Sequence, residues 1–91
     1  MLFVAIGHDS PEAPVLRPKF RDAHLAYLRP LLEQGKILLG GPFTDGSGMM
    51  VVLDLENEAA VREFFAKDPF VIEKVLDGMD IKPFRKVLPP D

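Results

Sequence analysis

The sequence predicts a single globular domain with an α+β fold, in which helices pack on an antiparallel sheet, and three observations point to it. Short apolar runs rich in β-branched residues alternate with longer stretches of helical periodicity. The chain has 91 residues, enough for one domain, so we expect residues 1–91 to fold as a single unit. Apolar residues form 47% of the chain and charged residues 27%, which is typical of a globular protein.

The first half of the chain predicts a strand, a long helix and a second strand. Residues 2–6 are an apolar run that predicts the first strand, and residues 8–14 predict a loop. Helical periodicity then covers residues 18–34, where Pro30 predicts a kink or a break into two helices. Residues 36–43 predict the second strand, with a bulge or a strand end at its two glycines.

A hairpin and a second helix are expected next. Residues 44–48 are rich in turn formers and predict the hairpin loop, and residues 49–55 predict the third strand. Asn57 is a typical N-cap residue, followed by an apolar stripe at helical spacing. Glycines in the hairpin do not form a phosphate loop, because no helix carrying Lys-Ser/Thr follows them.

The last part of the chain predicts a short helix and a final strand. Asp68-Pro69 ends the second helix and begins a third, which we expect to run through Leu76. Residues 81–87 predict the last strand, with Pro83 indicating an edge or an interruption, and residues 88–91 predict a loose tail. The resulting order, βαββα(α)β, is that of a ferredoxin-like fold.

The composition of the strands predicts a homodimer. Helices in this architecture cover one face of the sheet, so a face in contact with water would show alternating polar residues. The predicted strands at residues 2–6 and 49–53 are instead apolar at consecutive positions. A second subunit that packs sheet against sheet is the simplest cover for the second face.

Charge and composition argue against several classes of partner. The net charge is −3, with the basic residues spread along the chain, so we expect no nucleic acid partner. The apolar runs are too short to span a bilayer, and the N-terminus lacks the pattern of a signal peptide. There is no cysteine, which excludes thiolate metal sites and is consistent with the cytoplasmic location that we expect.

His24 is the first candidate for a functional residue. It lies four residues after Phe20 and four before Leu28, on the apolar stripe of the predicted helix. Imidazole titrates near neutrality, so a partly buried histidine can act as an acid or a base. The alternative is a core histidine that is hydrogen-bonded to a backbone carbonyl.

Asp68 is the second candidate, because its spacing from Phe64 and Phe65 allows it to face the same interior as His24. Asp followed by Pro is also a common helix start, and this capping role is the simpler interpretation. The two roles are compatible, since a carboxylate has two oxygens and can orient an imidazole N–H while capping a helix. Without a Ser or Cys nucleophile in a recognisable motif, such a dyad would act as a base.

Several further residues are candidates for substrate binding. His8 follows the first strand, where a pocket near the helix start can form, and Arg21 or Arg17 can hold an anionic group. The alternative is that these side chains simply face the solvent. Gly41 and Pro42 belong to a segment that allows close backbone approach to a ligand, or that forms a strand bulge. The histidines and carboxylates lack the spacing of a metal site, so we expect no metal and no cofactor.

Several segments together resemble the YCII-related family over nearly the whole chain. These segments are Arg21 to Leu28, Gly35-Lys36, Gly40-Gly41-Pro42, Lys67-Asp68-Pro69-Phe70 and Ile81-Lys82-Pro83-Phe84. The resemblance implies a ferredoxin-like dimer, a dimeric α/β barrel. It also implies an active site with a His–Asp pair, which matches His24 and Asp68 in this sequence.

The resemblance implies a function as well, because a relative eliminates chloride from a chlorinated aromatic diol and muconolactone isomerases share the architecture. We therefore expect an enzyme in which His24 and Asp68 transfer a proton on a small cyclic substrate. The alternative is a non-catalytic dimeric module that binds a metabolite or a protein. The fold alone does not decide between them.

Overall fold

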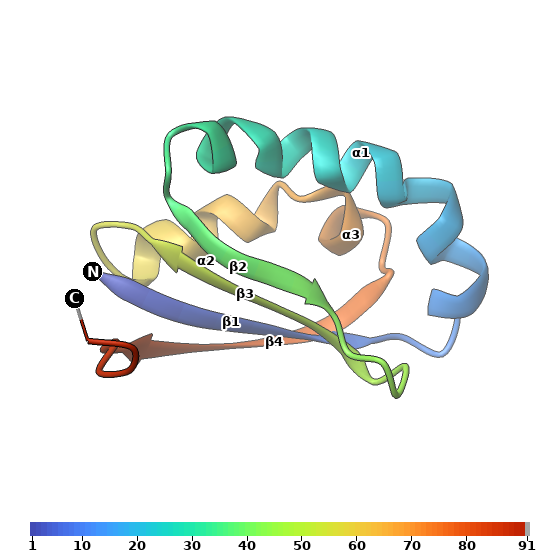
Figure 1. Ribbon diagram of the computed structural model, residues 1–91. Coiled ribbons are helices and arrows are strands. Elements are labelled where there is room, and N and C mark those ends of the chain that lie inside the picture. The colour runs from blue at the N-terminus through green and yellow to red at the C-terminus, as the bar shows by residue number, and fades with distance from the viewer. Residues whose placement is uncertain (91) are drawn as a thin grey trace.

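The computed structural model describes residues 1–90 and shows a four-stranded antiparallel sheet with three helices on one face (Figure 1). The elements are β1 (Leu2–Asp9), α1 (Ala13–Glu33), β2 (Ile37–Pro42), β3 (Gly48–Asp54), α2 (Glu58–Ala66), α3 (Pro69–Ile72) and β4 (Leu76–Phe84). This order confirms the predicted ferredoxin-like α+β fold. None of the helices within residues 1–90 is long and apolar enough to cross a membrane.

The strands are ordered β2-β3-β1-β4, so the two central strands are β3 and β1. In the register of the sheet, Ala5 lies opposite Val51 on one side and opposite Ile81 on the other. Pro83 lies on β4, an edge strand, as predicted. An edge position suits proline because this residue has no N–H to donate to a neighbouring strand.

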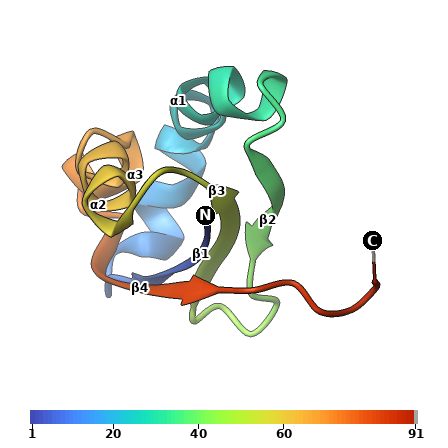
Figure 2. The same cartoon turned by 90° about the vertical axis from the view of Figure 1, so that its left-hand side faces the viewer.

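The core lies between the sheet and the helices. Phe3 and Leu53 project from the sheet into one buried cluster with Val61, Phe65 and Phe70 of the helices. Figure 2 shows the sheet end-on, with α1 beside the pair α2 and α3 above it and no helix below it. Side chains alternate along a strand, so every second residue of β1 and β3 faces the side without helices.

The start of α1 differs from the prediction. β1 continues through His8 and Asp9, which were expected in a loop, because His8 still pairs with residues of both neighbouring strands. α1 begins at Ala13 rather than at residue 18, with Pro14 in its first turn. Pro14 therefore takes a first-turn position, which suits a residue without an N–H.

The predicted break into two helices at Pro30 was wrong, because α1 runs without interruption to Glu33. Proline removes one helical hydrogen bond, here the bond to the carbonyl of Ala26. Both residues are exposed, so water can satisfy that carbonyl. Leu28, which is buried against the core, holds the preceding turn in place.

Three other features of the strands and helices differ from the predictions. The irregularity in β2 lies between Ile37 and Leu39 rather than at the glycines. α3 ends at Ile72 instead of Leu76, and a turn with Lys74 at φ 59° leads directly into the last strand. β4 therefore covers residues 76–84 rather than 81–87. In the predicted tail, residues 88–90 form no helix or strand, and residue 91 lies outside the described residues.

Candidate active site

His24 and Asp68 are brought together from different elements into one buried pair. α1 carries His24 on its core-facing side, and Asp68 is the N-cap residue of α3. The Nδ1 atom of His24 lies 2.8 Å from Oδ1 and 2.9 Å from Oδ2 of Asp68. Asp68 is fully buried and His24 is 7% exposed, so water does not compete for this contact.

Asp68 is also a helix cap. Its Oδ1 atom accepts a hydrogen bond of 3.0 Å from the backbone N–H of Phe70. The cap and the contact with the imidazole, which the sequence allows together, are therefore both present at this one carboxylate. A carboxylate only accepts hydrogen bonds, so Nδ1 of His24 is the protonated nitrogen that donates to it. In the neutral ring, Nε2 then carries the lone pair.

Phe70 fixes the orientation of the imidazole. Its ring is stacked on that of His24, with 3.9 Å between the centroids and 4° between the planes. Arg17 places its guanidinium carbon 5.2 Å from the centroid of the Phe70 ring and forms an ion pair with Asp9 of β1. Stacking and the bond to Asp68 together hold His24 in one position.

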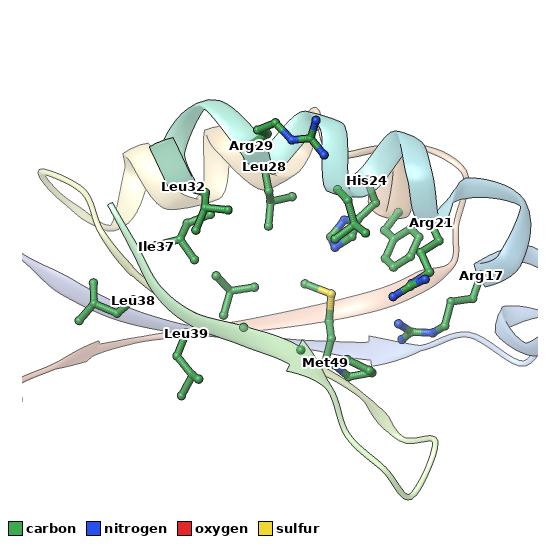
Figure 3. A pocket seen from close by; sticks show the side chains of 16 residues that line it. Arg17, Arg21, His24, Leu28, Arg29, Leu32, Ile37, Leu38, Leu39 and Met49 are labelled. Atoms are coloured by element: carbon green, nitrogen blue, oxygen red, sulfur yellow. The ribbon is translucent and has the colours of Figure 1, made fainter. Parts of the chain in front are cut away.

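A cavity of about 480 Å³ opens between α1 and the strands β2 and β3, and His24 lies in its wall (Figure 3). Most of the lining is apolar, and the polar side chains are His24 and three arginines. The lining residues are Arg17, Arg21, His24, Leu25, Leu28, Arg29, Leu32, Ile37, Leu38, Leu39, Gly40, Gly41, Pro42, Met49, Val51 and Phe70. Its size suits a small organic molecule.

The carboxylate charge of Asp68 also acts on Tyr27, which lies about one turn after His24 on α1. The Tyr27 hydroxyl donates a hydrogen bond of 2.6 Å to the backbone carbonyl of Phe64. Burial, and secondarily the charge of Asp68, raise the pKa of Tyr27 above its usual value. Tyr27 is therefore a neutral structural neighbour of the dyad at physiological pH.

The other candidate site residues fall into two groups. Arg21, Gly41 and Pro42 line the same cavity as His24. His8 does not line it, because its exposed side chain lies 2.8 Å from Asp80 on the neighbouring strand. Gly41 lies in the regular part of β2, and a Cβ atom there would meet nothing within 4 Å.

Sequence reasoning missed the role of Phe70. Only its place directly after Asp68-Pro69 could have indicated a position beside the dyad. The leucines of α1 at the cavity, such as Leu25, look like ordinary core residues in the sequence, yet Leu25 is exposed. Within residues 1–90, no three His, Asp or Glu side chains gather closely enough to hold a metal ion.

The fold and the cavity define a ferredoxin-like domain with a buried His–Asp pair beside an apolar opening. Within this class the chain belongs to the YCII-related family, whose domain matches residues 1–85. Protein YciI of Escherichia coli O6:H1 is 30% identical over 97 residues, covering 96% of this chain and 99% of that protein. A Haemophilus influenzae protein described only as uncharacterized is 31% identical over 100 residues, with the same coverage.

Solved structures share this fold. The 5-chloro-2-hydroxyhydroquinone dehydrochlorinase TftG of Burkholderia phenoliruptrix AC1100, in complex with 2,5-dihydroxybenzoquinone, superposes with a TM-score of 0.86. It is 28% identical, and the match covers 100% of both chains. PA3566 of Pseudomonas aeruginosa has a TM-score of 0.56 at 14% identity, covering 94% of this chain and 92% of its own, and shares the fold alone.

Proposed function

We propose that this protein is an enzyme that moves a proton on a small cyclic substrate, with His24 and Asp68 as an acid–base dyad. The reaction is a lyase-type elimination or the isomerisation of a lactone. The observation that carries the proposal is the buried pair, because Asp68 occupies Nδ1 of His24 and leaves Nε2 for chemistry at the cavity. The dehydrochlorinase activity of TftG supports the lyase class.

The dyad supplies the base that an elimination needs. Nε2 takes a proton from a carbon atom of the substrate, and the C–H electron pair forms the new double bond. The leaving group, chloride in a dehydrochlorination, departs with the electron pair of its own bond. The imidazolium that forms is stabilised by Asp68 at 2.8 Å. General base catalysis of this kind supplies about 10²- to 10⁴-fold in rate.

The cavity supplies the positioning that acid–base catalysis requires. A planar ring can lie against the apolar part of the lining, which includes Leu28, Val51 and Pro42. Holding the reacting carbon against Nε2 removes much of the entropic barrier. Arg21, at the rim of the same cavity, is placed to hold an anionic group.

The experiment is a turnover assay with a panel of small cyclic compounds. It includes 5-chloro-2-hydroxyhydroquinone, followed by chloride release, and unsaturated lactones, followed by ultraviolet absorbance. We expect turnover of a panel member, and a loss of at least about 10²-fold in His24→Gln. Asp22→Asn, an exposed change on the same helix, is the control and keeps the rate. A His24→Gln variant as fast as the wild type contradicts the proposal.

We further propose that the working form is a homodimer. The sheet face without helices carries Val4 and Ile6 of β1 beside Val52 of β3, and Leu39 next to Val52 is 62% exposed. A second copy that buries about 800 Å² of each partner would cover this face. Light scattering is expected to give twice the chain mass, and Val4→Glu is expected to give a monomer. A monomeric wild type at working concentration contradicts the dimer.

A further inference from the structure

A second cavity adjoins the one that contains His24. It has a volume of about 470 Å³ and lies between the start of α1 and the hairpin that joins β2 to β3. Its lining includes Phe43, Thr44 and Gly46 of the hairpin. Both cavities are lined by Arg17, Arg21 and Pro42, so these residues mark the junction between the two spaces.

The two arginines at the junction differ in their partners. Arg17 is half-buried, paired with Asp9 and placed over the ring of Phe70, so its positive charge is already balanced by the Asp9 carboxylate. Within residues 1–90, Arg21 has neither a hydrogen-bond partner nor an ion-pair partner. Asp9 is the only acidic side chain that lines either cavity in this part of the chain. Arg21 therefore brings an uncompensated positive charge to the junction of a protein whose net charge is −3.

Arg21 is also close to the dyad. It precedes His24 by three residues on α1, and side chains at this spacing are neighbours on one helix face. In Figure 3 the guanidinium groups of Arg21 and Arg17 point toward the sheet, as His24 does, while Arg29 points away from it. A group bound at Arg21 thus lies beside the part of the first cavity that is lined by His24.

We propose that Arg21, positioned beside the anchored Arg17, is an oxyanion subsite at the junction of the two cavities. The ligand is then a planar ring compound with a carboxylate or a ring oxyanion. The ring of this ligand lies in the cavity that contains His24, and its anionic group lies against Arg21. The planar guanidinium suits such a group because it can donate two parallel hydrogen bonds to it. This inference rests on the proposed function for the location of the reacting ring.

The test compares two probes of nearly the same shape, benzoate and the uncharged benzamide, by NMR titration of the full chain. We expect the wild type to bind benzoate more tightly. Arg21→Gln is expected to weaken benzoate binding by roughly 10- to 100-fold while changing benzamide binding little. Lys19 lies on the same helix but lines neither cavity. The variant Lys19→Gln loses the same charge as Arg21→Gln, and we expect it to bind both probes as the wild type does.

Equal affinity for the two probes overturns the subsite, as does no binding of benzoate at millimolar concentration. Unchanged benzoate binding in Arg21→Gln overturns it too, and so does an equal loss in Lys19→Gln. Arg21 is exposed, so its substitution leaves the fold intact, which an unchanged amide spectrum verifies. His24→Gln separates the two proposals, because it is expected to retain the preference for benzoate while it abolishes turnover.

Discussion

Replacing Asp68 should destabilise the protein by an amount that follows from its contacts. Asp68→Ala removes the cap from the N–H of Phe70, which costs about 1 kcal/mol. It also leaves the buried Nδ1–H of His24 without an acceptor, which costs about 1–3 kcal/mol more. The sum, about 2–4 kcal/mol, is a large part of the roughly 5–14 kcal/mol expected for a chain of this length. Asp68→Asn keeps an acceptor oxygen, so we expect it to cost about 1 kcal/mol.

The assay is urea unfolding at neutral pH for the wild type, both variants, His24→Gln and the double variant His24→Gln/Asp68→Ala. Because the two side chains are in contact, the double variant should be less destabilised than the sum of the single ones, by roughly 0.5–3 kcal/mol. A loss below about 0.5 kcal/mol in Asp68→Ala would mean that the buried contacts of Asp68 are absent in solution. Additive losses would refute the direct pairing.

The sequence was informative about the fold wherever local signals agreed with the tertiary structure. Asn57 caps α2 through the N–H of Ala60, as its type and position predict. The boundaries at the prolines were harder to predict, because proline is found both at helix starts and at kinks. The structure places Pro18 and Pro30 inside α1, where the packing of the whole helix outweighs the loss of single hydrogen bonds.

The candidate site was predictable to a similar degree. Helical spacing placed His24 on the buried stripe, and the cap position of Asp68 followed from Asp-Pro. The distance between them did not follow, because it depends on how α3 packs against α1. His8 was placed in a loop near a pocket, but continued strand pairing extends β1 and directs its side chain to Asp80. Such long-range pairing leaves no local signal in the sequence.

Three further predictions concern the surroundings of the site. Phe70→Leu removes the ring stacked on His24 and should cost about 1–2 kcal/mol in urea unfolding, with slower turnover. Tyr27→Phe removes a hydrogen bond worth about 1 kcal/mol. Because the folded pKa of Tyr27 is raised, the wild type should lose stability as the pH rises above 10.0 through that pKa, and this loss should be smaller in Tyr27→Phe. Gly48→Ala would place its Cβ 1.9 Å from a backbone carbonyl oxygen of β1 and should cost about 3 kcal/mol, whereas Gly41→Ala meets nothing within 4 Å and should cost little.

Each of these predictions has a contradicting result. Wild-type turnover in Phe70→Leu would show that stacking does not position the imidazole. Identical pH profiles for the wild type and Tyr27→Phe would show that the phenol is not shielded from water. Equal stability of the two glycine variants would contradict the close approach of β1 and β3 at Gly48.

Long-range proton–nitrogen NMR of the histidine rings shows whether Asp68 holds Nδ1–H and leaves Nε2 of His24 free to act as a base. Assignment of His24 comes from the spectrum of His24→Gln. We expect the neutral His24 ring to carry its proton on Nδ1 in the wild type, and a mixture of tautomers in Asp68→Asn, where an amide replaces the carboxylate. A wild-type ring protonated on Nε2 would rule out this role, because Nε2 would then have no lone pair with which to accept a proton.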